Sequence, residues 1–256
     1  MIGQNPNQCR SNRQRSDFYT EMWRALRENG HWRGELWNRR KSGEEYVELL
    51  SVAAVRGSDG TLMHYVGVFS DITRYKDYEA ELSRMAHFDP LTSLPNRRML
   101  ADRLGQAIAR ARRSGHMLAV CYLDLDGFKP INDRFGHEAG DRVLLEVSRR
   151  LLDALRADDT VARLGGDEFV LLLNGIEHSD ECLLVLRRVL DAVTGTRLED
   201  VPLSVSASIG VSLFPQDDAD ADALLRHADQ AMYHAKEAGR NCYHFFDPDH
   251  DKKLRA

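Results

Sequence analysis

The sequence predicts an α+β protein: a ferredoxin-like βαββαβ sandwich with a largely antiparallel sheet, preceded by a small antiparallel β block and a helical linker. Two observations support this fold class. Between residues 31 and 73, short aromatic and β-branched runs are separated by glycine-bearing turns, which is typical of an antiparallel meander. After Asp89, amphipathic helical segments alternate with apolar strand-like segments, and two strands follow one another directly.

The first block is expected to contain one helix and three strands. The segment FYTEMWRALRENG, which begins at Phe18, predicts the helix, and WRGELWNRR, YVELLSVAAV and LMHYVGVFSDIT predict the strands. These elements make a thin core, because a small domain buries too little apolar surface to be stable alone. We therefore expect that part of this fold is missing upstream.

The linker, residues 74–88, carries a coiled-coil pattern. Its apolar residues are spaced three, four and three apart on a charged background: Tyr75, Tyr78, Leu82 and Met85. This is the a and d spacing of a short coiled coil. Two heptads also fit an amphipathic helix that packs on its own domain, so both interpretations stay open.

The third block, residues 89–248, is expected to contain the sandwich, and residues 249–256 a tail. The predicted helices cover 97–113, 139–157, 181–193 and 221–239, and the predicted strands cover 116–126, 160–164, 168–173, 203–214 and 241–246. Without the first helix the order is βαββαβ, followed by one more helix and strand.

Composition narrows the function classes. The 256 residues carry a net charge of −5, which gives no support to general binding of nucleic acid or of an anionic membrane. The apolar runs are shorter than the roughly 20 residues of a membrane helix. The polar N-terminus has no signal-peptide core, although its arginines leave a transit peptide open as a minor alternative. No zinc or disulfide spacing relates the four cysteines, Cys9, Cys121, Cys182 and Cys242. A cytoplasmic location is predicted.

Two groups of acidic residues indicate chemistry. The strand LAVCYLDLD is apolar until Asp124 and Asp126, which share one face because they are two residues apart. The turn RLGGDEF carries Asp167 and Glu168 between two apolar runs. In a βαββ order this turn lies beside the end of the first strand, and a carboxylate cluster there is repulsive unless cations occupy it. Such oxygen ligands suit Mg²⁺, which takes one or two protein carboxylates together with phosphates and water.

Two familiar motifs fit this region less well. An EF-hand loop beginning at Asp124 needs oxygen ligands at its fifth and twelfth positions and glycine at its sixth, where the chain has Phe128, Phe135 and Lys129. DLDGF also resembles the opening motif of the haloacid dehalogenase phosphatases, but Phe128 replaces the expected hydroxyl residue. A phosphatase stays a minor alternative.

Four motifs, in order, resemble the GGDEF family of diguanylate cyclases. They are DPLTSLPNRR from Asp89, DLDGFKPINDRFGHEAGD from Asp124, RLGGDEF from Arg163 and AKEAGRN from Ala235. The resemblance implies the nucleotidyl-cyclase form of the fold and an enzyme that condenses two GTP molecules into cyclic di-GMP with release of two pyrophosphates. Because one such site holds one GTP, it also implies a homodimer whose two sites face each other.

The resemblance assigns metal and catalytic roles. Asp124, Asp167 and the backbone carbonyl of Leu125 resemble the ligands of two Mg²⁺ ions, for which Mn²⁺ is a substitute. Asp167 also matches the proposed acceptor of the proton from the attacking 3′-hydroxyl. Glu168 resembles the auxiliary acid of the turn.

The remaining matches concern nucleotide binding. Asn132 and Asp141 resemble the guanine readers, since a carboxylate accepts from both N–H groups of the guanine Watson–Crick edge. His137 lies in the same loop as a further contact, and it fits a capping or packing role equally well. Three cations resemble the triphosphate-binding group: Lys129, Lys236 and Arg240. Without the resemblance, the last two would be read as a favourable helix C-terminus.

Arg156 and Asp159 form an RxxD sequence nine residues before Gly165, which matches the inhibitory product site of the family. Arginine binds phosphate and guanine groups there, so the resemblance implies non-competitive inhibition by cyclic di-GMP. The rival interpretation is a catalytically weak GGDEF-like module that only binds cyclic di-GMP.

The first block, residues 1–73, resembles the second half of a PAS sensor domain. The matching segments are HWRGELWNRRKSGEEY and DGTLMHYVGVFSDIT, whose closing DIT commonly leads into a signalling helix. The first strands and short helices of a PAS domain have no counterpart here. The segment GQNPNQCRS lacks the flavin-adduct motif of light-sensing PAS domains, so the sequence names no stimulus.

Overall fold

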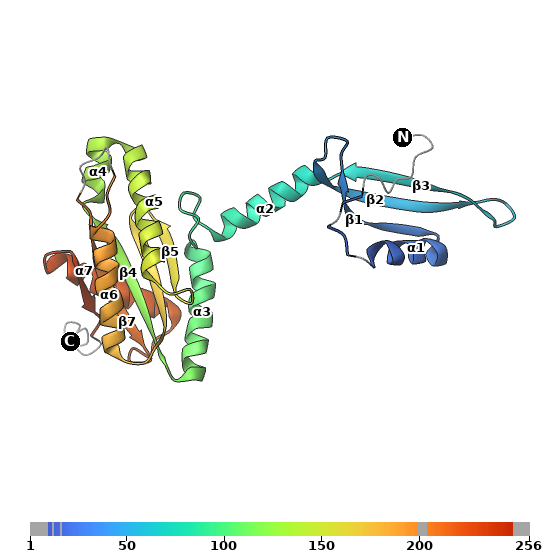
Figure 1. The fold of residues 1–256 in the computed structure, drawn as a ribbon. Helices are drawn as coiled ribbons and strands as arrows, with labels where there is room; N and C mark the ends of the chain where they lie inside the picture. The colour runs from blue at the N-terminus through green and yellow to red at the C-terminus, as the bar shows by residue number, and fades with distance from the viewer. Residues whose placement is uncertain (1–9, 12, 16, 199–203, 248–256) are drawn as a thin grey trace. The chain divides into compact units, whose positions relative to one another are not determined.

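The computed structural model describes residues 10–11, 13–15, 17–198 and 204–247 (Figure 1). The predictions for Cys9 and for the tail, residues 249–256, lie outside these ranges. The chain divides into two units, Met1–Ser83 and Arg84–Ala256, and each is described by itself. In the described part of either unit, no helix combines the length and the apolar character needed to cross a membrane.

The first unit is a three-stranded antiparallel sheet with one helix. Helix α1 (Phe18–Asn29) leads into β1 (His31–Arg39), β2 (Glu45–Arg56) and β3 (Leu62–Asp71), which pair in the order β1-β2-β3. The helix ends at Gly30, whose φ of 73° lies in the left-handed region that favours glycine. Met22 and Leu26 are buried, and Trp23 contacts Tyr65 of β3 edge to face at 5.4 Å between ring centroids. The predicted antiparallel block is confirmed.

Apolar side chains of β3 and of the following helix α2 (Thr73–His87) are exposed. On β3 these include Met63, Val68 and Phe69, each at least 63% exposed. Helix α2 has no buried residue, and the four apolar positions of the coiled-coil pattern are 51–67% exposed: Tyr75, Tyr78, Leu82 and Met85. The helix buries none of these four side chains within the described chain.

The second unit contains a five-stranded sheet in the order β5-β6-β4-β7-β8. Neighbouring strands are antiparallel except β7 and β8, which are parallel. The sheet confirms the predicted sandwich, with the extra strand added at one edge. Its helices and strands, in chain order, are α3 (Arg97–Ser114), β4 (Met117–Asp126), α4 (Phe128–Phe135), α5 (His137–Ala154), β5 (Thr160–Gly165), β6 (Glu168–Ile176), α6 (Ser179–Thr194), β7 (Ser206–Phe214), α7 (Ala221–Glu237) and β8 (Cys242–Phe245).

Helix α4 corrects the expectation that Asn132 and His137 share one loop. Asn132 lies in α4, whereas His137 begins α5 after Gly136. Helix α4 has only eight residues and carries Pro130, which weakens its helical signal. The proline is tolerated because it lies in the first turn, where its missing N–H would have no helical partner.

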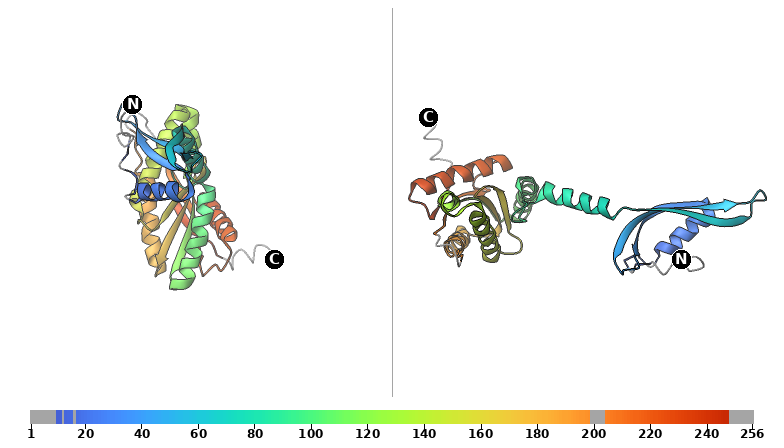
Figure 2. Two further views of the ribbon diagram at one scale, coloured as in Figure 1. Left: turned by 90° about the vertical axis from the view of Figure 1, so that its right-hand side faces the viewer. Right: turned by 90° about the horizontal axis from the view of Figure 1, so that it is seen from above.

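Alternate residues of the central strand β4 enter two different cores. Cys121 and Leu123 pack with α5 and α6, whereas Val120 and Tyr122 pack with α3 and α7. Helix α7 and the pair α5 and α6 accordingly lie on opposite sides of the sheet (Figure 2). Because side chains alternate along a strand, Asp124 points to the same side as Tyr122, the side of α3 and α7. The alternation of side chains along β4 therefore places Asp124 on the face of the sheet that α7 covers, so that side chains of α7 can contact it.

Gly210 of β7 allows α7 to pack directly on the sheet. A Cβ atom at this position would overlap the backbone of Ala228 and Met232 in α7. Backbone atoms cannot rotate away as the end of a side chain can, so α7 would have to move. The position of α7 matters for the site because Lys236 lies in its last turn.

We predict that Gly210→Ala lowers the free energy of unfolding by about 3 kcal/mol, because the added methyl group overpacks the contact between β7 and α7. Urea unfolding followed by circular dichroism measures the change. Gly105→Ala is the matched control: Gly105 lies in α3 with open space around it, and the replacement should stabilise that helix by up to about 1 kcal/mol. Equal stabilities for the two variants would contradict the close packing.

Candidate active site

The turn between β5 and β6 lies against the end of β4. Asp124 is the register partner of Glu168, and the backbone N–H of Leu125 donates to the carbonyl oxygen of Asp167 over 3.2 Å. Gly165 and Gly166, with φ of 146° and 52°, form the bend in conformations that L side chains rarely adopt. The predicted meeting of the strand end and the acidic turn is therefore present in the fold.

Asp124 is paired with Lys236 of α7. The Lys236 Nζ lies 2.8 Å from the Asp124 Oδ1. Burial, together with the negative charges of Asp167 and Asp126, raises the pKa of Asp124, although the Lys236 ammonium opposes the shift. A second positive charge near Asp124 would favour its ionised form.

Asp126, the second acid of the strand end, has a different environment. It is 8% exposed and accepts hydrogen bonds from the hydroxyls of Ser206 and Ser208, both at 2.8 Å, and from the backbone N–H of Asn241 at 3.2 Å. The Nε of Arg240 lies 4.0 Å from its Oδ1. The two acids share a face of β4, but Asp126 is engaged by protein donors on both oxygens.

Glu168 contacts a buried tyrosine. Tyr122, two residues before Asp124 on the same face of β4, donates its hydroxyl hydrogen bond to Glu168. Burial and the nearby Glu168 carboxylate raise the pKa of Tyr122 above its ordinary value, so the hydroxyl stays protonated and remains a donor. Glu168 is thus hydrogen-bonded to Tyr122 on the same face of the sheet.

Arg163 connects the acidic turn to the loop that precedes α3. Its guanidinium donates to the carbonyl oxygen of Gly166 through Nε at 3.1 Å and Nη2 at 2.8 Å, and to Asp89 through Nη1 at 2.9 Å. Burial raises the pKa of Asp89, but hydrogen bonds from Thr92 and Arg163 outweigh it and lower the pKa. The ionised Asp89 therefore compensates the charge of an arginine that is only 9% exposed.

Asn132 is positioned by close contact between α4 and α5. A Cβ atom added to Gly140 would overlap the Oδ1 of Asn132 and lie 3.2 Å from the Cζ of Phe128. Gly140 immediately precedes Asp141, so the Asn132 side chain of α4 lies against the turn of α5 that carries Asp141. Asp141, His137 and Lys129 are exposed.

The predicted product site forms a turn before β5. Asp159 accepts from the backbone N–H of Arg156 at 3.1 Å and from that of Asn174 at 3.0 Å, while Arg156 itself is exposed. A polar cavity of about 260 Å³ borders Asp159 and is also lined by Arg103 and Arg110 of α3. Asp159 therefore fixes the turn, and the arginines surround it with positive charge.

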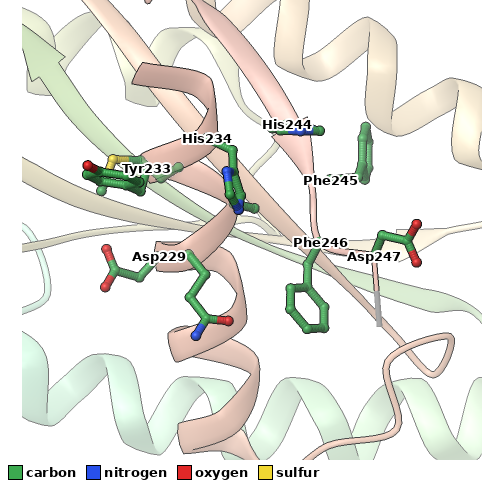
Figure 3. Close-up of a pocket in the computed structure, with 10 residues that line it drawn as sticks. Asp229, Tyr233, His234, His244, Phe245, Phe246 and Asp247 are labelled. Atoms are coloured by element: carbon green, nitrogen blue, oxygen red, sulfur yellow. The ribbon is translucent and has the colours of Figure 1, made fainter. Parts of the chain in front are cut away.

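A larger cavity lies away from these acids. It measures about 650 Å³ and is lined by Tyr233 and His234 of α7, by His244 of β8 and by Phe246 after that strand, among others (Figure 3). It contains none of the predicted site residues. Among the described residues, no group of three or more His, Cys, Asp and Glu side chains is arranged to hold a metal ion, so a metal at Asp124 and Asp167 requires backbone or substrate oxygens as well.

Sequence reasoning missed Gly140, Arg163 and the serines that bind Asp126. Gly140 carries a signal, because glycine inside a helix is destabilising and therefore suggests close packing. Arg163 also carries a sequence signal, since a charged arginine in an apolar strand is expected to be buried and therefore to need an anionic partner. Ser206 and Ser208 carry none, because their bonds to Asp126 join residues 80 and 82 positions apart.

Comparisons with known proteins agree with this geometry. The model of the family described as "Diguanylate cyclase, GGDEF domain" matches residues 86–242, and a PAS domain model matches residues 1–74. The bifunctional diguanylate cyclase/cyclic di-GMP phosphodiesterase MucR of Pseudomonas aeruginosa is 47% identical over 167 residues, which cover 65% of this chain and 24% of MucR. The chain thus spans about a quarter of that relative.

Two solved structures are similar to the second unit. The GGDEF domain of TpbB from Pseudomonas aeruginosa aligns with a TM-score of 0.61 and 40% identity, covering 66% of this chain and 100% of that one. The coiled coil and GGDEF domain of DgcB from Caulobacter crescentus, solved in complex with c-di-GMP, aligns with a TM-score of 0.60 and 26% identity, covering 68% and 93%. The chain belongs to the GGDEF-domain family of diguanylate cyclases.

Proposed function

We propose that this chain is a diguanylate cyclase, which joins two GTP molecules into cyclic di-GMP and releases two pyrophosphates. The observation that carries the proposal is the placement of the GGDEF turn against the end of β4: Asp124 is in register with Glu168, and Lys236 pairs with Asp124. Acidic ligands and a phosphate-binding cation therefore meet at one place. GTP as substrate fits the cytoplasmic location that the sequence predicts.

The donor set fits Mg²⁺. Two carboxylates, Asp124 and Asp167, and the carbonyl oxygen of Leu125 would hold a pair of ions, with substrate phosphates and water completing the coordination. Mn²⁺ would substitute, because it also accepts oxygen ligands. When bound, the ions neutralise charge on the α-phosphoryl group and on the pyrophosphate leaving group.

The residues of the chain bind and orient the nucleotide and move one proton. Asp167 accepts the proton of the 3′-hydroxyl as that oxygen attacks the α-phosphorus of the facing GTP. Glu168, which accepts a hydrogen bond from Tyr122, adds a second negative charge beside Asp167 in the turn. The triphosphate is bound by three cations: Lys129, Lys236 and Arg240. Lys236 is 30% exposed and can exchange Asp124 for a phosphate oxygen.

Guanine is bound by Asn132 and Asp141, with His137 as a neighbouring contact. The Asp141 carboxylate is exposed and accepts two hydrogen bonds from the N1–H and N2–H groups of guanine, a donor pair that adenine does not offer. Gly140 lets Asn132 approach the same helix closely. Selectivity for GTP over ATP rests on this pair.

The reaction requires a homodimer, because each chain holds one nucleotide and the two must attack each other. Helix α2 supports this requirement. Its exposed apolar positions follow the a and d pattern, and in a parallel pair the neighbouring g and e positions, Arg74 and Glu79, have opposite charges across the seam. The linker, residues 74–88, would thus join the PAS-like block to the catalytic unit as a short coiled coil.

Cyclic di-GMP would inhibit the enzyme at Arg156 and Asp159. The exposed guanidinium of Arg156, with Arg103 and Arg110 beside the same turn, gives positive charge for the two phosphates of the product. The DgcB structure contains c-di-GMP, which supports product binding by a relative of this fold. A module that only binds cyclic di-GMP is the second candidate function.

We predict that the full chain converts GTP and Mg²⁺ into cyclic di-GMP and pyrophosphate, and that Asp124→Asn and Asp167→Asn each lower kcat at least about 100-fold. The substitutions keep the side-chain volume and remove a charged oxygen ligand. Nucleotide chromatography together with a pyrophosphate assay gives the result. Release of inorganic phosphate would favour the phosphatase alternative, and a verified dimer that binds cyclic di-GMP without forming it would favour the binding module.

We predict that Gly140→Ala raises the KM for GTP at least about tenfold, since the new methyl group displaces the Asn132 amide and one guanine hydrogen bond is lost. Preference for GTP over ATP should fall with it. The control is Gly105→Ala, which adds the same methyl group where no atom lies within 4 Å. An unchanged KM in a folded Gly140→Ala enzyme would show that Asn132 does not bind guanine.

We predict that Arg156→Ala relieves product inhibition. In the parent enzyme, added cyclic di-GMP should lower kcat at constant KM, and in the variant the concentration for half inhibition should rise at least about tenfold, because charge-assisted bonds to phosphate are lost. Arg149→Ala is a control, as Arg149 is an exposed arginine of α5 paired with Glu146 and Asp153. If the Arg156→Ala enzyme stops forming cyclic di-GMP at the same product concentration as its parent, the proposed inhibitory site at Arg156 is contradicted.

A further inference from the structure

We propose that Asp126 is a positioning residue that fixes the turn after α7 and thereby holds Arg240 where it binds the triphosphate. The triphosphate as ligand rests on the proposed function. Asp126 lies two residues after Asp124, and no motif assigns it a role. Its contacts in the structure assign it one.

Both oxygens of Asp126 are engaged by protein donors. The Oδ1 accepts from the Ser208 hydroxyl at 2.8 Å. The Oδ2 accepts from the Ser206 hydroxyl at 2.8 Å and from the backbone N–H of Asn241 at 3.2 Å. Hydrogen bonds to an ionised acceptor are stronger than those between neutral groups. The serines of β7 therefore hold the carboxylate, and the carboxylate holds the backbone of the turn.

The turn after α7 needs this hydrogen bond because two consecutive non-glycine residues adopt the left-handed backbone conformation. Arg240 has φ of 64° and Asn241 has φ of 48°; this left-handed region is disfavoured for arginine, although asparagine enters it more readily. The Arg240 N–H donates to the Ala235 carbonyl oxygen at 3.1 Å, and the Asn241 Oδ1 accepts from Thr194 at 3.2 Å. The bond from Asn241 N–H to Asp126 fixes the middle of this strained segment to the sheet.

The direction of Arg240 follows from the same contact. Its Nε lies 4.0 Å from the Asp126 Oδ1, while the side chain remains 64% exposed. The charge is therefore directed to the end of β4 and still accessible to an anion. Next to it, Lys236 pairs with Asp124. Each carboxylate of β4 therefore faces one cation: Asp124 faces Lys236 in the last turn of α7, and Asp126 faces Arg240 in the turn that follows.

We test this with Asp126→Ala and Asp126→Asn in the full chain, using 3′-deoxy-GTP as the probe. This nucleotide keeps guanine and the triphosphate but lacks the attacking hydroxyl, so its Kd reports binding without condensation. Asp126→Ala should weaken binding, and raise the KM for GTP, about tenfold, with kcat within about threefold of the parent. Asp126→Asn keeps a carbonyl oxygen for Asn241 N–H and should remain within about threefold in Kd.

A double-mutant cycle with Arg240→Ala separates positioning from general damage. If Asp126 acts through Arg240, the double variant binds no more weakly than Arg240→Ala alone, because coupled residues are not additive. Arg149→Ala, which removes an exposed arginine of α5 paired with Glu146 and Asp153, is the control and should bind within about threefold of the parent. If Asp126→Ala does not fold, Asp126→Ser, too short to reach Asn241, replaces it with the same expectation.

Three results would overturn the proposal: binding equal to the parent in folded Asp126→Ala, additive losses in the cycle, or loss of kcat at unchanged KM. The last would indicate that Asp126 acts on the reacting groups instead. A parent chain that binds 3′-deoxy-GTP but forms no cyclic di-GMP from GTP would contradict the proposed function alone, and the binding measurements would still decide the role of Asp126.

Discussion

The pairing of β4 with β6 is the constraint on which the site depends. Its register sets Asp124 opposite Glu168, and Leu125 N–H holds the carbonyl of Asp167. Both faces of β4 are buried, so a slip by one residue would exchange the two cores and turn Asp124 away from α7. The hydrophobic alternation that stabilises the sheet therefore also orients the acids.

Gathering carboxylates at one strand end opposes folding, because like charges repel and burial favours their neutral forms. The fold limits this cost by giving acids separate partners. Asp124 faces Lys236, Asp126 accepts bonds from protein donors, and Glu168 accepts from Tyr122. Burial keeps the pKa of Asp124 raised despite Lys236, so a bound cation would stabilise the ionised carboxylate further.

Much of the fold was predictable from local signals. Apolar periodicity and glycine turns located the strands and the longer helices, and the motifs indicated which strand ends carry acids. Helix α4 was missed because it is short and contains Pro130. The contacts of Asp126 and Arg163 were missed for a different reason: they join residues far apart in sequence, Asp89 with Arg163 and Asp126 with Asn241. A buried Arg163 indicates that an anion must lie nearby, but no local pattern says which residue supplies it, because the partner is fixed only once the sheet order is set.

Under the proposed function, the same sheet explains why one chain is insufficient. The acids, Lys236 and Arg240 converge on a single end of β4, so a chain positions one triphosphate and one 3′-hydroxyl. Condensation of two GTP molecules on a single chain would need a second set of triphosphate-binding cations, and the motif residues supply only one set. Catalysis therefore depends on how two such strand ends are brought face to face. Helix α2, whose apolar positions are exposed, ends two residues before Asp89, which binds Arg163; under the proposed function, pairing of two such helices would therefore be continuous in sequence with the turn that Arg163 holds.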